Sequence, residues 1–509
     1  MATVKRALLS CADKTGLEPF ANALASLGVE LVASGGTAEA LRRQGLRVTS
    51  VEEFAGIAEQ LDGRVKTLHP KIHAGILARR DDPAHVRAVG AAGLIDLVAV
   101  NLYPFERTAQ QAGAPLAEAI EQIDIGGVAL LRAAAKNFAH VAVVCEPSQY
   151  DEVAAALRKG KGTMPDELAR RLAVRAFALT SAYDAAITGY LGGAVAAEET
   201  SFRLRKRQPL RYGENPHQPG AWYVPAAGAA WGVGTLTQLQ GKELSYNNLL
   251  DLDAALRCLA DFEEPTCAII KHHSQCGLAS APSAGEAYAR AYACDAESAF
   301  GGIVGVNRPI DAPLAEQLAS TFLEVVAAPS VDPQALARFA KKPNLRVVTV
   351  AWPLKGSNEG EWRQLLGSWL FQETDGTIVG AEPPRVVTRR APTERERVDL
   401  LFAWKAAKHA LSNGVVLASQ GATVGIGQGQ PSRVGSVRVA LEKAGARSRG
   451  TVAASDGFFP FPDGVTALAD AGVTAIIQPG GSIRDAEVIA AADAAKMAMM
   501  FTGVRHFRH

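Results

Sequence analysis

The sequence has little of what covalent or metal-bound frameworks are built from. It contains six cysteines in 509 residues, with no CxxC pair and no zinc-ribbon spacing. A disulfide scaffold needs a much higher cysteine density, and a structural zinc site needs closely spaced ligand pairs. The sequence therefore excludes a disulfide framework and predicts no metal site.

Charge of one sign and long apolar runs are also missing. There are 53 Lys and Arg against 52 Asp and Glu, so the net charge is +1. No bulk attraction to nucleic acid or to a membrane surface follows from this balance. No apolar run approaches the ~20 residues that span a bilayer, and the apolar stretch near the N-terminus is too short for a signal peptide. We expect a cytoplasmic protein that binds neither nucleic acid nor membrane.

The common nucleotide and hydrolase motifs are absent as well. The sequence has no GxxxxGK[ST], HExxH, GxSxG or protein-kinase set. The segment GIGQGQPSR (425–433) lacks the GxGxxG spacing, and Pro431 and Ser432 stand where a helix should begin. A Rossmann dinucleotide site is therefore not expected.

Strand and helix signals alternate over the first ~150 residues. This alternation predicts an α/β fold with a parallel sheet covered on both faces. Helices are expected at 13–28 and 35–45, and residues 151–200 read as helical and alanine-rich. Strands or strand-like segments are expected at 6–12, 29–34, 46–54, 94–105 and 140–146.

Charge and proline concentrate in FRLRKRQPLRYGENPHQPG (202–220), which indicates a boundary near residue 200. Beyond it, short β-rich runs alternate with alanine-rich helices, so we expect α/β structure again, in two sub-units.

Two glycine pairs lie at the start of expected helices, in ASGGT (33–37) and IDIGGVALLRAAAK (123–136). Glycine lets backbone N–H groups approach an anion, and a helix N-terminus favours negative charge. A plain tight turn is the alternative for each pair. Two such turns in one α/β unit make a phosphate site more credible than either alone.

Basic residues crowd the loop GRVKTLHPKIHAG (63–75), and NLYPF (101–105) follows an apolar strand. The loop is either a solvated basic segment or an anion-binding one. Ligands bind at the carboxyl ends of strands in open α/β sheets, so Asn101 and Tyr103 are placed to reach a ligand. Similarly, SDGFFPFPDG (455–464) is either core or a surface on which a flat ring stacks.

KHHSQCGLA (271–279) follows the apolar run TCAII. Neighbouring residues on a strand point to opposite faces, so His272 and His273 are not expected to share a metal. One histidine beside Lys271 would make an acid–base pair, because the ammonium favours the neutral imidazole. Two ordinary polar residues at a strand end are an equally good interpretation of the local sequence.

Taken together, these segments resemble one family, the bifunctional purine-biosynthesis proteins that join an IMP cyclohydrolase to an AICAR formyltransferase (AICAR is the carboxamide ribonucleotide of aminoimidazole). The resemblance runs from about residue 5 to the last residue. Its motifs are GRVKTLHP, NLYPF, IDIGG with LLRAAAKN, LRYGENPHQ, ELSYNNLLD, ESAFGGI, SNGVVLA, GIGxGQxSR, SDGFFPF, QPGGSIRD and the terminal RHFRH.

The resemblance implies a methylglyoxal-synthase-like cyclohydrolase domain at 1–197. It implies a formyltransferase domain at 198–509, made of two cytidine-deaminase-like subdomains without the deaminase zinc. It further implies a homodimer, 10-formyltetrahydrofolate as cosubstrate, no tightly bound cofactor, and a monovalent cation near the transformylase site.

For the cyclohydrolase, the resemblance implies catalysis by Lys66, Tyr103, Asp124 and Lys136. These side chains would stabilise an oxyanion or move protons while formyl-AICAR loses water to close the IMP ring. It implies that substrate is bound by Ser10, Lys14, Ser34, Gly35, Gly36, Thr37, Arg64, Thr67 and Asn101.

For the formyltransferase, His272 matches the base that removes a proton from the 5-amino group of AICAR. Lys271 matches the group that stabilises the oxyanion, and Asn413 the residue that positions the carboxamide or formyl group. Nucleotide-contacting positions match Arg211, Tyr212, Asn248, Phe300, Gly301, Glu324, Arg433 and Arg505, and the folate side matches Asp456 with the FFPF loop.

Three departures from the family pattern bear on this site: Ser274-Gln275 replaces a pair that ends in proline, Gln428 and Pro431 are unusual, and Glu324 stands where Asp is common. Two other functions compete. A non-catalytic nucleotide sensor on the same fold is disfavoured by the complete sets of catalytic residues, and a metal-dependent deaminase by the missing zinc-ligand spacing.

Overall fold

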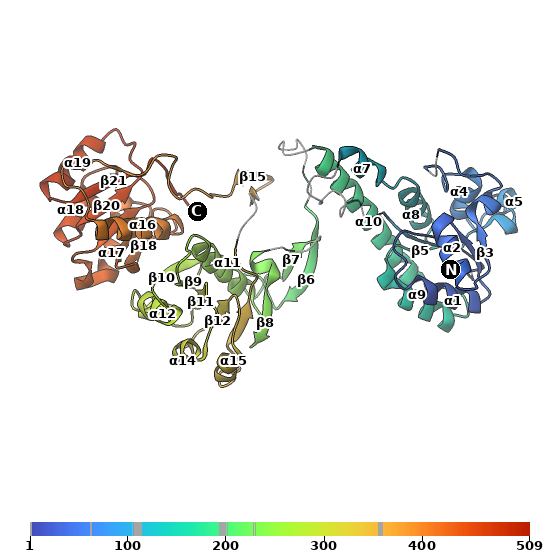
Figure 1. Cartoon of the computed structure of the whole chain (residues 1–509), viewed down its shortest axis with the longest axis horizontal. Helices are drawn as coiled ribbons and strands as arrows, with labels where there is room; N and C mark the ends of the chain where they lie inside the picture. The colour runs from blue at the N-terminus through green and yellow to red at the C-terminus, as the bar shows by residue number, and fades with distance from the viewer. Residues whose placement is uncertain are drawn as a thin grey trace. The chain divides into compact units, whose positions relative to one another are not determined.

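The computed structural model (Figure 1) describes residues 3–61, 64–103, 105, 115–192, 200, 202–226, 229, 231–354 and 360–509. The chain divides into two compact units, Met1–Phe202 and Arg203–His509. The boundary predicted between residues 197 and 198 lies outside the described residues.

The first unit is built on a five-stranded parallel sheet of order β3-β2-β1-β4-β5, as strand–helix alternation predicts. Its strands are β1 Arg6–Cys11, β2 Glu30–Ala33, β3 Val48–Ser50, β4 Leu97–Asn101 and β5 Ala142–Val144. Its helices are α1 Leu17–Ser26, α2 Gly35–Arg43, α3 Val51–Ala55, α4 Pro70–Leu77, α5 Pro83–Val89, α7 Leu116–Glu121, α8 Gly126–Lys136, α9 Tyr150–Lys159 and α10 Asp166–Gly192.

β4 is buried along its whole length and β1 along most of it, which explains their apolar content. The strand order reverses between β1 and β4. Ligands of open parallel sheets bind outside the carboxyl ends of the strands at such a reversal. Ser10 and Asn101 lie at those ends.

The prediction of one strand-like segment over 46–54 is wrong in its second half. Only Val48–Ser50 is a strand, and helix α3 follows at once. Ser50 accepts a hydrogen bond from the Glu53 N–H, and the Glu53 side chain accepts one from the Ser50 N–H. This capping box starts a helix that the apolar pattern alone does not indicate.

The second unit is built on a mixed sheet of twelve strands, with two small hairpins, β6–β7 and β14–β15. Its strands are β6 Leu204–Leu210, β7 Gly220–Pro225, β8 Thr237–Gln240, β9 Thr266–Lys271, β10 Ser274–Ser280, β11 Ile303–Val306, β12 Val325–Ala328, β13 Arg346–Thr349, β14 Gly360–Leu365, β15 Ser368–Glu373, β16 Arg385–Val386, β17 Val415–Ser419, β18 Ala422–Gly427, β19 Val452–Ser455, β20 Ala475–Gln478 and β21 Ala498–Phe501. Its helices are α11 Tyr246–Ala260, α12 Ala284–Tyr292, α13 Ala296–Ala299, α14 Ala312–Ser320, α15 Pro333–Phe339, α16 Glu394–Lys408, α17 Arg433–Ala444, α18 Asp463–Asp470 and α19 Asp485–Ala494.

This large sheet repeats itself. One half has the order β10-β9-β11-β12-β13-β8 and the other β18-β17-β19-β20-β21-β16. Each step has the same direction in both halves: antiparallel, antiparallel, parallel, parallel, antiparallel. The halves meet where Ala279 of β10 pairs with Ala422 of β18.

The repeat extends to the hairpin that opens each half. A two-residue turn joins β9 to β10 and another joins β17 to β18, and all four turn residues have positive φ. In the second of these turns, Gln420–Gly421, the Gly421 N–H donates to Asp399 of α16 at 2.8 Å.

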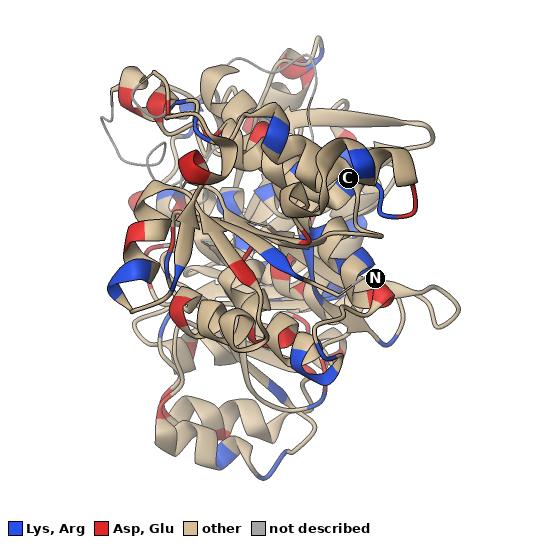
Figure 2. Cartoon of the chain, turned by 90° about the vertical axis from the view of Figure 1, so that its right-hand side faces the viewer, with Lys and Arg blue, Asp and Glu red and all other residues tan. Residues whose placement is uncertain are grey.

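Acidic and basic residues are interspersed along the elements (Figure 2), in keeping with the near-zero net charge. Over the described ranges, none of the helices combines the length and the apolar character that crossing a bilayer requires.

Candidate active sites

The first candidate site lies where α2 begins, at the carboxyl ends of β1 and β2. Ser34 is the N-cap of α2, and its Oγ lies 2.8 Å from Ser10 Oγ instead of capping the helix. Thr37 Oγ1 bonds both backbone groups of Cys11, at 3.0 and 3.1 Å. The first N–H groups of a helix have no partner within it, so this strand-to-helix junction can bind an anion.

Lys66 lies against the same helix start. Its Nζ is 3.8 Å from the point where a Cβ on Gly35 would lie, and it pairs with Glu59 at 3.2 Å. A cation next to the positive end of a helix is unfavourable unless an anion binds between them. The SGGT turn and Lys66 therefore form one cradle at the helix start, in which Glu59 balances the charge of Lys66.

Two further predicted residues hold the loop after β1. The Asn101 side chain accepts from the Asp13 N–H at 2.8 Å and donates to the Asp13 carbonyl at 2.7 Å. Lys14 Nζ donates to the Cys11 carbonyl at 3.2 Å. Asn101 thus fixes the loop that carries Lys14, and Lys14 is exposed on that loop.

Asp124 lies just before α8, and its Oδ1 accepts from the Gly127 N–H at 2.7 Å. Burial raises the pKa of Asp124, and the backbone N–H groups of Gly127 and Tyr103 oppose the rise. A Cβ on Gly126 would lie 2.6 Å from Thr67 Oγ1, and one on Gly127 would lie 2.5 Å from Asp124. This glycine pair makes room for a hydroxyl and a carboxylate, a steric role that the sequence pattern did not distinguish from anion binding.

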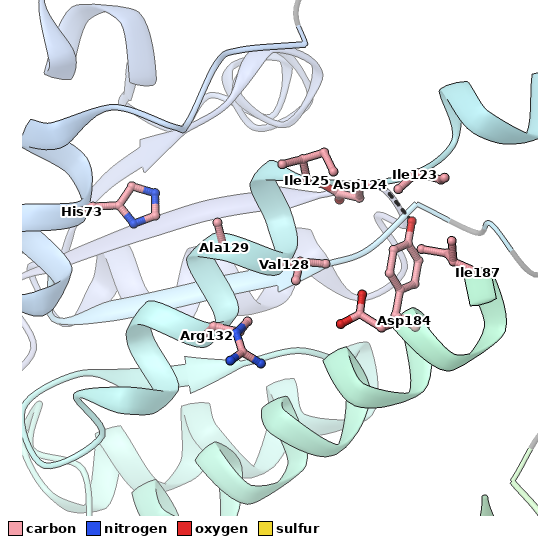
Figure 3. A pocket seen from close by; sticks show the side chains of 10 residues that line it. His73, Ile123, Asp124, Ile125, Val128, Ala129, Arg132, Asp184 and Ile187 are labelled. Carbon is pink, nitrogen blue, oxygen red and sulfur yellow. Dashed lines mark hydrogen bonds between the residues drawn. The ribbon is translucent and has the colours of Figure 1, made fainter. Parts of the chain in front are cut away.

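A cavity of about 430 Å³ opens beside Asp124, between α4, α8 and α10 (Figure 3). The Tyr183 hydroxyl accepts from the Asp124 N–H at 2.8 Å and donates to the Gln122 carbonyl at 2.9 Å, which fixes the chain where it enters α8. His73 and Arg132 line the cavity as well, and burial lowers the pKa of His73.

Two predicted members of this site lie apart from Asp124. Lys136 is the last residue of α8 and is exposed. At 1.5 Å per residue, it lies about 15 Å along the helix axis from Gly126. Arg64 forms an exposed ion pair with Glu121. Within the first unit, the structure brings together Lys66, Thr67, Tyr103 and Asp124 more closely than Lys136.

The second candidate site is the turn between β9 and β10, and here one premise of the sequence analysis is wrong. His272 and His273 do not lie on a strand; they form the whole two-residue turn, with φ of 53° and 61°. Both N–H groups donate to the Asp251 carboxylate of α11, at 3.2 Å from His272 and 2.6 Å from His273. Asp251 therefore supports a backbone conformation that non-glycine residues rarely adopt.

The side chains around this turn have distinct partners. Lys271 Nζ donates to the Phe300 carbonyl at 2.7 Å, so two predicted site residues meet. His273 Nε2 lies 2.8 Å from Arg508 Nη2. The His272 ring is exposed, and no hydrogen bond of this ring is found within the described parts of the chain. His272 thus carries the accessible ring of the pair, and His273 carries the anchored one.

A buried polar cluster lies at the start of the second half. Arg433 forms an ion pair with Asp456, whose side chain is fully buried, and Arg433 Nη2 donates to Asn413 Oδ1 at 2.8 Å. Asn413 Nδ2 donates to the Gln430 carbonyl at 2.8 Å. The amide of Asn413 is therefore fixed at both ends and keeps one N–H and one lone pair for a ligand.

A cavity of about 480 Å³ adjoins this cluster. It is lined by Asn413 and Arg433 and by three exposed or partly exposed aromatic rings, Phe458, Phe461 and Phe507. Part of the FFPF loop is therefore a cavity wall and not core, although Phe459 between them is buried.

The departures Gln275 and Gln428 contact one another. Gln428 Nε2 donates to the Gln275 carbonyl at 3.0 Å, and Gln428 Oε1 lies 3.4 Å from the Leu411 N–H. The buried Gln275 side chain donates to the Ala406 carbonyl at 3.0 Å. Hydrogen bonds thus fix the chain after the histidine turn, where the family pattern has a proline.

The remaining predicted residues have local partners in the second unit. Asn248 closes the N-terminal capping box of α11 with Ser245. Glu324 pairs with Arg346 at 2.5 Å. The guanidinium of Arg211 lies over the ring of Tyr212 and that of Arg505 over Phe507, and Gly301 has a φ of 76°.

Sequence reasoning missed Asp251 and Arg508 and assigned no role to His273. Asp251 ends the motif ELSYNNLLD and Arg508 lies in RHFRH, so both residues stand in motifs that the family resemblance includes. Their partner in the turn, His273, is 22 residues from Asp251 and 235 residues from Arg508 in sequence. Among the described residues, no group of three or more His, Cys, Asp or Glu is arranged to hold a metal ion.

Comparison with known proteins identifies the chain. The model of the AICARFT/IMPCHase bienzyme matches residues 134–443, and that of the MGS-like domain matches residues 16–129. The bifunctional purine biosynthesis protein PurH of Dinoroseobacter shibae is 50% identical, covering 100% of this chain and 99% of its own length. The PurH of Nostoc punctiforme is 49% identical over 99% of each chain.

A solved structure described as the crystal structure of ForH matches with 37% identity over 38% of this chain and 100% of its own, at a TM-score of 0.35. The family suggested by the motifs in the sequence is the one found by both the full-length relatives and the two family models. The chain belongs to the family of bifunctional purine biosynthesis proteins, the AICARFT/IMPCHase bienzymes.

Proposed function

We propose that this chain catalyses the last two steps of IMP synthesis, with one step in each unit. The second unit would transfer a formyl group from 10-formyltetrahydrofolate to the 5-amino group of AICAR. The first unit would close the ring of formyl-AICAR with loss of water. The observation that carries this proposal is the turn in which the accessible ring of His272 stands next to Lys271, held to Phe300 at 2.7 Å.

In formyl transfer, His272 takes a proton from the amine as its nitrogen attacks the formyl carbon. The lone pair of that amine is delocalised into the ring, so a positioned base matters. The Lys271 ammonium stabilises the oxyanion of the tetrahedral adduct. The adduct then collapses: the bond from the formyl carbon to N10 breaks, and a proton passes to N10. Asn413 holds the carboxamide or formyl oxygen with its free N–H.

The cavity beside Asn413 supports a folate site. Its aromatic walls, Phe458, Phe461 and Phe507, suit a flat ring system. The buried Arg433–Asp456 pair fixes the Asn413 amide that faces this cavity. Folate acts here as a cosubstrate, and we propose no tightly bound cofactor.

In ring closure, the carboxamide nitrogen attacks the formyl carbon within the same molecule, so proximity is intrinsic to the substrate. The helix start at SGGT holds the phosphate, and Lys66 stabilises the developing oxyanion. The raised pKa of Asp124 suits a group that accepts and returns a proton as water leaves. Tyr103 joins this set through its position next to Asp124. Lys136, which lies at the far end of α8, would contribute less.

Three further proposals rest on family membership. We propose two cytidine-deaminase-like subdomains in the second unit, which the repeated strand order supports. We also propose a cytoplasmic homodimer whose formyltransferase sites use both chains. A monovalent cation near the formyltransferase site completes these proposals.

The test is to measure both reactions in three variants. His272→Ala should abolish formyl transfer and leave cyclisation of supplied formyl-AICAR intact. Asp124→Ala should do the reverse, so these two variants control for one another: each shows the mutated unit of the other in its unaltered form. Lys136→Ala should lower cyclisation less than Asp124→Ala. Full formyl transfer by His272→Ala would refute the base assignment.

A further inference from the structure

A hydrogen bond from Arg508, a residue far along the chain, holds the turn that carries His272. We propose that Arg508 is a positioning residue for formyl transfer, which acts through His273 to fix the orientation of His272. This inference rests on the proposed function of the second unit and deepens it. Arg508 itself does not touch the reacting atoms.

The contact between Arg508 and His273 has only one chemical reading. A guanidinium has five N–H donors and no acceptor, so His273 Nε2, 2.8 Å from Arg508 Nη2, must present its lone pair. The proton of the neutral ring then lies on Nδ1. His273 is therefore an acceptor that is already occupied, and it cannot serve as the base at this atom.

The surroundings of His273 agree with a neutral ring. Burial lowers its pKa first, and Arg508 lowers it further. Asp251, Asp253 and Arg257 of α11 are the other charged groups that face it, and the two carboxylates oppose the shift. The geometry requires the same state, because a protonated His273 could not accept from Arg508.

Arg508 also grips the segment that carries Asn413. Its backbone N–H donates to Ser412 Oγ at 3.1 Å, and its carbonyl accepts from the Ser412 N–H at 2.8 Å. Its Nη1 donates to the His409 carbonyl at 3.0 Å. One residue thus ties the histidine turn of the first half to the residue before Asn413 in the second half.

This tie matters because the reacting groups come from opposite halves of the sheet. At the centre of the sheet, the strand pairing between the halves consists of Ala279 with Ala422. Hydrogen bonds from Gln428 to Gln275 and between Thr423 and Leu278 also join the halves, and the one from Arg508 is the bond that reaches a side chain of the histidine turn itself. Misalignment would slow the chemical step without removing the contacts that bind the nucleotide, so kcat should fall more than the KM for AICAR rises.

Two substitutions at His273 separate an acceptor role from a merely structural one. Gln places an oxygen about where Nε2 lies and still accepts from Arg508, whereas Leu fills similar space and accepts nothing. We expect His273→Leu to lower kcat for formyl transfer about tenfold, with the KM for AICAR within about twofold. His273→Gln should keep at least half of the wild-type kcat.

Arg508→Met tests the donor side and should reproduce the kcat loss of His273→Leu. Arg389, an exposed arginine of the same unit with a side chain 92% accessible, supplies the matched control. Arg389→Met should leave both reactions unchanged. Cyclisation of supplied formyl-AICAR reports on folding of the first unit, and the thermal unfolding midpoint of each variant reports on the second.

Wild-type kcat in both His273→Leu and Arg508→Met would overturn this inference. So would an equal loss in His273→Gln and His273→Leu, or a rise in KM with unchanged kcat. If the wild-type enzyme cyclises formyl-AICAR but transfers no formyl group, the proposed function fails first, and this inference fails with it. A loss of kcat in Leu and Met that Gln rescues supports it.

Discussion

Replacing Asp251 with Asn removes one of the two acceptors beneath the His272–His273 turn. Two non-glycine residues in the left-handed region cost about 1–2 kcal/mol each, or roughly 2–4 kcal/mol for the turn. Two backbone hydrogen bonds to a charged acceptor, here of 3.2 and 2.6 Å, contribute about 1.5–3 kcal/mol each, or roughly 3–6 kcal/mol. The carboxylate therefore offsets the strain with a small surplus.

Asn keeps one neutral acceptor, worth about 0.5–1.5 kcal/mol, and turns an NH₂ group toward the other N–H. The hydrogen bonds then stabilise the turn by less than the backbone strain costs, so the turn leaves its aligned conformation part of the time. We expect Asp251→Asn to lower kcat for formyl transfer by at least about tenfold, equivalent to about 1.4 kcal/mol. The KM for AICAR should change little.

The assay is steady-state formyl transfer, with cyclisation of formyl-AICAR measured on the same preparation. Asp253→Asn, two residues along α11, removes the same charge from a carboxylate that pairs with Arg257 at 2.7 Å, and it should leave kcat near the wild-type value. An Asp251→Asn enzyme with wild-type kcat would refute the strain argument. Equal losses in the two variants would assign the effect to charge and not to the turn.

Four other outcomes are expected. Asp124→Asn should slow cyclisation yet raise the unfolding midpoint of the first unit. Because burial raises the folded-state pKa of Asp124 above 3.8, the stability gap between variant and wild type should widen as pH rises through that pKa. A gap that is constant between pH 4 and 7 would contradict this. Gln428→Leu removes the bonds to Gln275 and Leu411 and should lower kcat for formyl transfer about fivefold, the equivalent of one hydrogen bond of about 1 kcal/mol. Phe461→Ala should raise the KM for 10-formyltetrahydrofolate roughly 2- to 10-fold, as expected for a stacking contact of about 0.5–1.5 kcal/mol, with AICAR kinetics unchanged. Arg390 holds Glu396 ionised against the effect of burial, with a pKa of about 2. The contribution of Glu396 to the free energy of unfolding should therefore be lost as the pH falls from 4.5 to about 2, and Glu396→Gln should flatten that part of the stability profile.

The parallel sheet of the first unit and its helix start at SGGT could be predicted from the sequence because their signals are local. Buried strands read as continuous apolar runs, and a glycine pair after a strand marks a helix start. The helix at Val51–Ala55 was equally local, since Ser50 and Glu53 form a readable capping box. The apolar pattern of this segment indicates a strand, whereas the cap decides for a helix.

The histidine turn could not be predicted in this way. A two-residue turn with positive φ normally contains Gly or Asn, whereas here both positions are His. The carboxylate that makes the turn possible, Asp251, lies on a helix earlier in the chain, and Arg508 lies at its end. The sequence motifs predicted candidate side chains, but only the folded chain shows which groups hold them in place.

The duplicated hairpin has a consequence for how this enzyme can be altered. The Gln420–Gly421 turn repeats the backbone conformation of the histidine turn, and Asp399 accepts from it as Asp251 does from the other. The two halves therefore share a strand order and also a turn that a carboxylate from a helix supports. The second turn is therefore a ready mount for engineered side chains, which would gain the same rigid support without any change to the native chemistry.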